Sequence, residues 1–138
     1  MEYSDSLLRR ILSSSPVIAL VGASPKPHRA SNSVMRFLQN NGHKVFPINP
    51  VCAGQTINQE TVLKTIEEVP VPVDMVDIFR RSEHAGEAVD EAIKVNAKTV
   101  WMQLDVIDVA AADRAKQAGL DVIMDRCPVI EYRRLGMV

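Results

Sequence analysis

The chain has 138 residues, 46% of them hydrophobic and 24% charged, which is ordinary for a single globular domain spanning residues 1–138. Its formal net charge of −1 gives no sign of the basic surface that proteins use to bind nucleic acid or an anionic membrane. No apolar run approaches the roughly 20 residues that a membrane span needs, and the first residues lack the pattern of a signal peptide. We therefore expect a cytoplasmic protein whose two cysteines, Cys52 and Cys127, are reduced thiols.

Short apolar segments alternate along the chain with segments of helical periodicity. A first helix is predicted over about residues 4–13, with Ser4 or Asp5 as its N-cap. Further helices are expected over about residues 32–40, 82–93 and 108–116. The segments predicted as strands are short and rich in β-branched residues, and they cover residues 17–21, 44–48, 73–79, 99–103 and 121–124.

This alternation is typical of a parallel sheet that carries helices on both faces. Right-handed crossovers favour the strand order 3-2-1-4-5, so we predict an α/β fold with a Rossmann-like, doubly wound sheet of five strands. Such sheets bind ligands beyond the carboxyl ends of the strands, where the order reverses between strands one and four. Asp74 and Asp77 interrupt the third strand, and we interpret them as the polar side of an edge strand.

The end of the first strand has the features of a phosphate-binding turn. Gly22 allows a tight turn and close approach of the backbone to a ligand, and Ser24 offers a hydroxyl group. The next helix begins near Asn32, which is equally well explained as a plain N-cap or as a neighbour of a phosphate. The loop between them carries cations that either stay solvated or contact phosphate groups, namely Lys26, His28 and Arg29.

The chain lacks the complete fingerprint of an NAD(P) site. Only the first glycine of G-x-G-x-x-G is present, at Gly22. The second strand ends at Asn49-Pro50, where NAD would require a carboxylate, and no arginine lies between Arg36 and Arg80 to serve NADP. An NAD(P)-binding redox protein therefore stays as the less favoured alternative. No Walker A motif supports hydrolysis of ATP or GTP.

Five patches of sequence occur in the order and spacing of the small stand-alone CoA-binding proteins. They are Val-Gly-Ala-Ser (21–24), Val-x-Pro-x-Asn-Pro (45–50), Pro-Val-Asp (72–74), Val-Trp-Met-Gln (100–103) and Asp-Arg-Cys-Pro (125–128). From about Leu12 to Arg134 the chain resembles this family, which is similar to the N-terminal CoA-binding domain of the succinyl-CoA synthetase α subunit. The resemblance implies a Rossmann-type domain that holds coenzyme A with its phosphates at the first loop. Asp105 departs from it, because a glycine is expected there, and the synthetase's second domain has no counterpart.

The predicted binding residues combine the strand-end positions with this resemblance. They are Gly22, Ala23, Ser24, Lys26, Arg29, Asn32, Asn49, Pro50, Phe79, Arg80 and Gln103. We expect non-catalytic binding of CoA or acyl-CoA, in a regulatory role or as a module that works with a protein partner or as a homo-oligomer. No metal ligand is predicted, because no residues have the required spacing.

No catalytic residue is predicted either. An enzyme acting on acyl-CoA is the remaining alternative, and Cys127 is its best candidate nucleophile. Pro128 is expected to keep the chain extended after the last strand, so that no helix begins beneath the Cys127 sulfur. No histidine occurs in the final third of the chain to act as a local base. We therefore expect no enzymatic activity.

Overall fold

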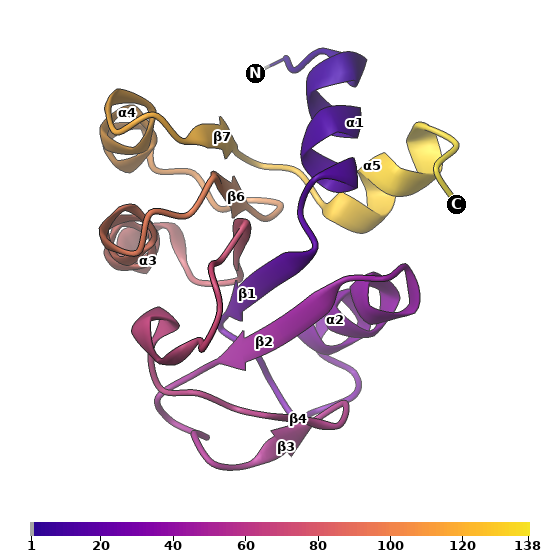
Figure 1. The fold of residues 1–138 in the computed structure, drawn as a ribbon, viewed down its shortest axis with the longest axis vertical. Helices are drawn as coiled ribbons and strands as arrows, with labels where there is room; N and C mark the ends of the chain where they lie inside the picture. Colours follow the sequence, from indigo (N-terminus) through magenta and orange to yellow (C-terminus); the bar gives the residue numbers. More distant parts are fainter. Residues whose placement is uncertain (1) are drawn as a thin grey trace.

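A five-stranded parallel sheet forms the centre of the computed structural model, which describes residues 2–138 (Figure 1). The strand order is β2-β1-β5-β6-β7. The bounds of these strands are β1 Val17–Val21, β2 Lys44–Ile48, β5 Met75–Ile78, β6 Thr99–Met102 and β7 Asp121–Ile123. Each of them lies within a segment that the sequence predicts as a strand, and the predicted α/β, Rossmann-like fold class is confirmed.

The predicted strand order 3-2-1-4-5 is wrong in the position of the third strand. This strand is β5, and it pairs with β1 on one side and β6 on the other, so the order counted over the five predicted strands is 2-1-3-4-5. All four residues of β5 are buried, as expected for a central strand. Asp77 has 0% exposure, so its interpretation as part of an edge strand is also wrong. The order therefore reverses between β1 and β5.

The edge beside β2 is occupied by the chain between β2 and β5. Leu63 forms an isolated parallel bridge with Ile48 of β2. Before it, the short strands β3 (Thr56–Ile57) and β4 (Glu60–Thr61) form an antiparallel hairpin. The turn of this hairpin contacts the helix α2 (Ala30–Asn40), where the Gln39 side-chain amide donates a 3.0 Å hydrogen bond to the Asn58 carbonyl.

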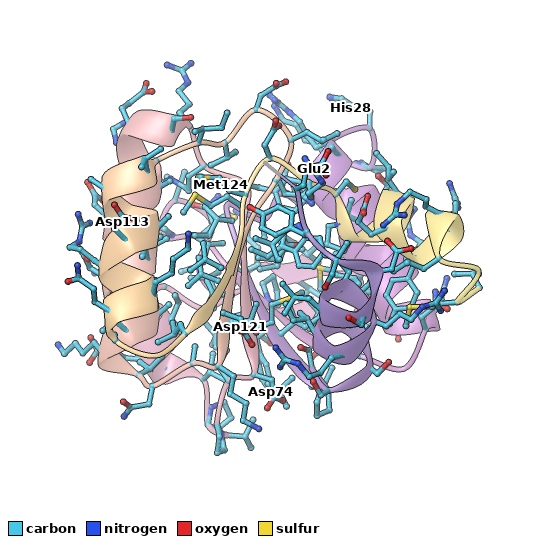
Figure 2. All side chains as sticks on the ribbon, turned by 90° about the horizontal axis from the view of Figure 1, so that it is seen from above. Glu2, His28, Asp74, Asp113, Asp121 and Met124 are labelled. Carbon is cyan, nitrogen blue, oxygen red and sulfur yellow. The ribbon has the colours of Figure 1, made fainter. Side chains whose placement is uncertain are left out.

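Helices cover both faces of the sheet, as predicted (Figures 1 and 2). One face packs against α1 (Asp5–Ser13), α2 (Ala30–Asn40) and α5 (Pro128–Arg134). The other face packs against α3 (Ser82–Lys94), α4 (Val109–Gln117) and the 3₁₀ turn η1 (Ile66–Glu68). No helix within residues 2–138 is long and apolar enough to cross a membrane.

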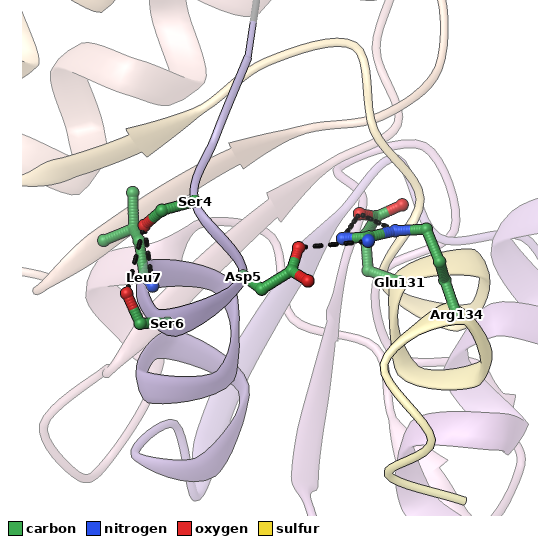
Figure 3. A network of polar contacts seen from close by, with 6 residues as sticks. All are labelled: Ser4, Asp5, Ser6, Leu7, Glu131 and Arg134. Atoms are coloured by element: carbon green, nitrogen blue, oxygen red, sulfur yellow. Dashed lines mark hydrogen bonds and ion pairs between the residues drawn. The ribbon is translucent and has the colours of Figure 1, made fainter.

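The ends of the chain meet through α1 and α5. Ser4 caps α1, because its hydroxyl oxygen accepts a 3.1 Å hydrogen bond from the Leu7 N–H. Arg134 of α5 lies 3.0 Å from carboxylate oxygens of both Asp5 and Glu131 (Figure 3). The contact with Asp5 attaches the first helix to the last one, while Glu131 lies on α5 itself. The predicted N-cap of α4 is also confirmed, since the Asp108 side chain accepts from the Ala111 N–H.

The start of α5 contradicts the prediction of an extended turn after Cys127. Cys127 is the N-cap of this helix and Pro128 is its first residue. The missing N–H of proline is harmless at that position, and its fixed φ already suits a helix. A proline after a strand is compatible with either outcome, and here it begins a helix.

Candidate functional site

The turn after β1 is held between its two neighbouring strands. The N–H groups of Gly22 and Ala23 both donate to the Ile48 carbonyl of β2, at 3.0 and 3.3 Å. Gly22 has a φ of +88°, and a Cβ at this position would lie 2.6 Å from the Phe79 carbonyl oxygen at the end of β5. The glycine is therefore required both by its backbone conformation and by the close approach of β5.

Two asparagine side chains fix the carbonyl groups of the same turn. The Asn49 amide donates to the Ala23 carbonyl at 2.9 Å, while its oxygen accepts from the Val51 N–H. The Asn32 amide donates to the Ser24 carbonyl at 3.0 Å, and its oxygen accepts from Arg36 at 2.7 Å. Asn32 is thus buried and supports the turn, and its predicted role as a plain N-cap is wrong, because Arg29 is the N-cap of α2.

The start of α2 presents unpaired donors and positive charge. No group within residues 2–138 accepts a hydrogen bond from the N–H of Ser24, Ala30 or Ser31. Arg29 is the N-cap and has no side-chain cap bond, and the first turn of α2 carries no acidic residue. Lys26 and Arg29 are exposed in the loop before the helix. This arrangement favours binding of an anion. The unpaired N–H groups and the N-terminal end of the helix dipole are positive, as are the loop cations.

A cleft of about 520 Å³ lies over this turn at the carboxyl edge of the sheet. Figure 2 shows His28 of the loop at the same edge as Met124 just after β7, whereas Asp74 and Asp121 lie at the opposite edge. Predicted residues that line the cleft are Gly22, Ala23, Ser24, Lys26, Arg29, Asn49 and Phe79. The structure therefore brings together the loop after β1 and the ends of β2 and β5.

The remaining predicted residues lie elsewhere. Pro50 and Arg80 line a smaller hollow of about 260 Å³ directly beside the cleft, with which it shares Gly22, Asn49 and Val51. Asn32 and Gln103 are buried and line neither space.

Sequence reasoning missed the side of the cleft that follows β2. Val51, Cys52 and Gln55 line it, and Val51 is 91% exposed. An apolar residue directly after a strand-ending Asn-Pro was the one available signal, because residues 51–63 have no clear period. Pro25, Ala30 and Ser31 complete the lining.

Cys127 lies apart from this cleft, beside a groove of about 410 Å³ between α2 and α5. Its side chain is 8% exposed. Burial raises the pKa of the Cys127 thiol, although hydrogen bonds from the backbone of Ile130 and Val129 oppose this effect. The protonated thiol is therefore favoured over the reactive thiolate.

Comparison with known proteins identifies the family of this fold. A family model described as a CoA binding domain matches residues 16–133. The chain belongs to the CoA-binding domain family. The resemblance drawn from the five sequence patches is confirmed at this level.

Relatives of the CoA-binding domain family differ in size. The uncharacterized protein YneT of Bacillus subtilis (strain 168) is 33% identical over 127 residues, covering 90% of each chain. A hypothetical protein from Pyrococcus horikoshii OT3 is 36% identical with a TM-score of 0.92, covering 96% of this chain and 92% of that one. The dinucleotide forming acetyl-coenzyme A synthetase 1 of Ca. Korarchaeum cryptofilum is 26% identical with a TM-score of 0.69. It matches 83% of this chain, which spans 27% of the synthetase.

Proposed function

We propose that this chain binds coenzyme A or an acyl-CoA in the cleft beside Gly22, with the phosphate groups at the start of α2. One observation carries the proposal. The unpaired N–H groups of Ser24, Ala30 and Ser31 border the same cleft as the exposed cations Lys26 and Arg29. Helix N-termini of this kind stabilise phosphates, and membership of the CoA-binding domain family supports CoA as the ligand.

The composition of the cleft fits the adenosine end of CoA. Its lining contains two cations and no acidic residue within the described chain. Val51 and Cys52 offer an apolar surface on the side of the hairpin, where a flat base would be shielded from water. Phe79 forms the opposite wall, and the pantetheine arm would leave the cleft over the ends of β5 and β6.

NAD(P) fits the same cleft less well. Asn49 stands where a carboxylate would grip the ribose of NAD, and its amide is already bonded to the Ala23 carbonyl. CoA carries a third phosphate on its ribose, which makes cations in the cleft favourable and a carboxylate unfavourable. We therefore rank an NAD(P)-binding redox protein second.

We further propose that binding is not coupled to catalysis. The protonated thiol of Cys127 is a poor nucleophile, and no histidine lies near it in the sequence to act as a base. These features favour a ligand-binding role in the cytoplasm. A protein partner or a second copy of the chain would then recognise the ligand-bound form.

Isothermal titration tests the proposal directly. Wild-type protein is titrated with CoA, acetyl-CoA and NADH under identical salt conditions. We expect CoA or acetyl-CoA to bind at least tenfold more tightly than NADH, and Arg29→Ala to weaken CoA. Arg9→Ala, which removes an exposed arginine on α1, is the matched control and should leave affinity unchanged. Tighter binding of NADH than of CoA would overturn the assignment.

A further inference from the structure

Three buried side-chain atoms within residues 2–138 have no hydrogen-bond partner. They are both carboxyl oxygens of Asp77 and Nε2 of Gln103. The side chain of Asp77 has 0% exposure and Gln103 has 5%. Burying a polar group without a partner costs stability, so such a group in a well-packed sheet requires an explanation.

Both residues lie on one face of the sheet, at its carboxyl end. Asp77 of β5 stands in register with Leu20 of β1 and Trp101 of β6. Leu20 and Trp101 belong to the core beneath α1, α2 and α5, so Asp77 points into that layer. Gln103 comes two residues after Trp101 and therefore lies on the same face. The two unpaired groups thus occupy neighbouring strands, next to the point where the strand order reverses.

A third polar group lies close to them. Cys127 packs in the same core as Trp101, and it lies close enough to Asp77 for the two side chains to interact electrostatically. Cys127 also borders the groove between α2 and α5. A ligand arm that followed the proposed course across the carboxyl ends of β5 and β6 would pass beside this cluster.

The unfilled bonding capacity of the pair includes two donors. Burial raises the pKa of Asp77 well above its ordinary value, which favours the neutral acid with one O–H group. The free atom of Gln103 is an amide nitrogen, which also donates. Two donors without partners favour a group that carries oxygen lone pairs, and their burial disfavours a charged group, so a carbonyl fits best.

We propose that Asp77 and Gln103 form a second subsite, which donates hydrogen bonds to a carbonyl oxygen in the arm of the bound ligand. The inference rests on the proposed function, because CoA has two amide carbonyls in its pantetheine arm and acyl-CoA adds a thioester carbonyl. Gln103 is the outer member of the pair. Asp77 is the inner one, and the arm reaches it by displacing side chains that cover it.

This role makes an unusual prediction about stability. An unpaired buried acid weakens the fold, so Asp77→Leu should raise the unfolding midpoint by several degrees while it weakens binding. Asp74 is the matched control, since it is buried at the opposite edge and is satisfied by the Val17 N–H at 2.9 Å and Lys98 at 3.2 Å. Asp74→Asn should lower the unfolding midpoint. It should leave unchanged the difference in affinity between ligands with and without the pantetheine arm.

The test compares ligands with and without the arm. Wild type, Asp77→Leu, Asp77→Asn, Gln103→Leu and Asp74→Asn are titrated with CoA, acetyl-CoA and 3′-phospho-ADP. We expect Asp77→Leu and Gln103→Leu to weaken CoA about tenfold, the effect of one lost hydrogen bond, and 3′-phospho-ADP less than twofold. Asp77→Asn keeps a donor and should bind CoA within about twofold of wild type. A loss seen with CoA identifies an amide carbonyl, and a loss confined to acetyl-CoA identifies the thioester.

Several results would overturn the subsite. Equal losses for CoA and 3′-phospho-ADP, or no loss with any ligand, exclude a contact to the arm. A lower unfolding midpoint for Asp77→Leu shows a structural role instead. If Asp77→Leu does not fold, that structural role is likewise the conclusion. Failure of the proposed function gives a different result, in which the wild type does not bind CoA at all.

Discussion

Replacing Gly22 by alanine should lower the free energy of unfolding in two ways, through backbone strain and through a steric contact. With a φ of +88°, an alanine at residue 22 would be strained by about 1–2 kcal/mol. Its Cβ would also lie 2.6 Å from the Phe79 carbonyl oxygen and 3.0 Å from the carbonyl carbon, both of them backbone atoms of the sheet edge. Forcing such a contact apart costs about 1–3 kcal/mol more. We expect Gly22→Ala to lower the free energy of unfolding by about 2–5 kcal/mol in total.

Gly119→Ala is the matched control for this experiment. Gly119 has a φ of +91°, almost the same as Gly22, but a Cβ there would meet nothing within 4 Å. This variant should lose only the backbone strain, about 1–2 kcal/mol. The difference between the two variants therefore measures the contact with Phe79.

Urea denaturation provides the measurement. With a slope of about 1.5 kcal/mol/M, a difference of about 2 kcal/mol separates the two midpoints by about 1.3 M. Gly22→Ala should also weaken CoA binding, because relief of the contact moves either the turn or the end of β5. Equal losses of stability in the two variants would refute the reasoning, since they would show that strain alone explains the glycine.

Three further predictions concern the cleft and Cys127. Lys26→Ala and Arg29→Ala should each weaken CoA by about 1 kcal/mol and dephospho-CoA by less, as measured by titration, and equal losses would show that neither contacts the 3′-phosphate. Asn49→Ala should lower the free energy of unfolding by about 1–2 kcal/mol in urea, because the Ala23 carbonyl loses its donor, and unchanged stability would exclude that role. In a Cys52→Ser background, alkylation of Cys127 should reach half its maximal rate at a pH above about 8.5, the ordinary value for a thiol, because burial raises its pKa. Rapid alkylation at pH 6, or thioester hydrolysis that Cys127→Ser abolishes, would contradict the non-catalytic role.

The local sequence pattern was sufficient to find the strands and the glycine turn after β1. The apolar segments ending at Val21 and Ile48 are strands in the structure, and the turn that begins at Gly22 lies at the carboxyl edge as expected. These features depend on neighbouring residues alone, since a buried strand needs consecutive apolar residues and a tight turn needs glycine.

Features set by distant contacts could not be predicted in the same way. The position of β5 depends on its pairing with β1, and the two carboxylates in that segment suggested an edge. The unpaired burial of Asp77 is visible only once both neighbouring strands are in place. Val51 lines the cleft from the segment after β2, and residues 51–63 carry no period that predicts this.

Backbone amide NMR tests most directly the proposal that the phosphates of CoA bind at the start of α2. In a titration of the ¹⁵N-labelled protein with CoA, the unpaired N–H groups of Ser24, Ala30 and Ser31 should show the largest shifts of their resonances. The N–H of Gly119, which lies after α4 and already donates to the Lys116 carbonyl, should not move. Large shifts elsewhere with none at Ser24, Ala30 and Ser31, or larger shifts there with NADH than with CoA, would contradict the account.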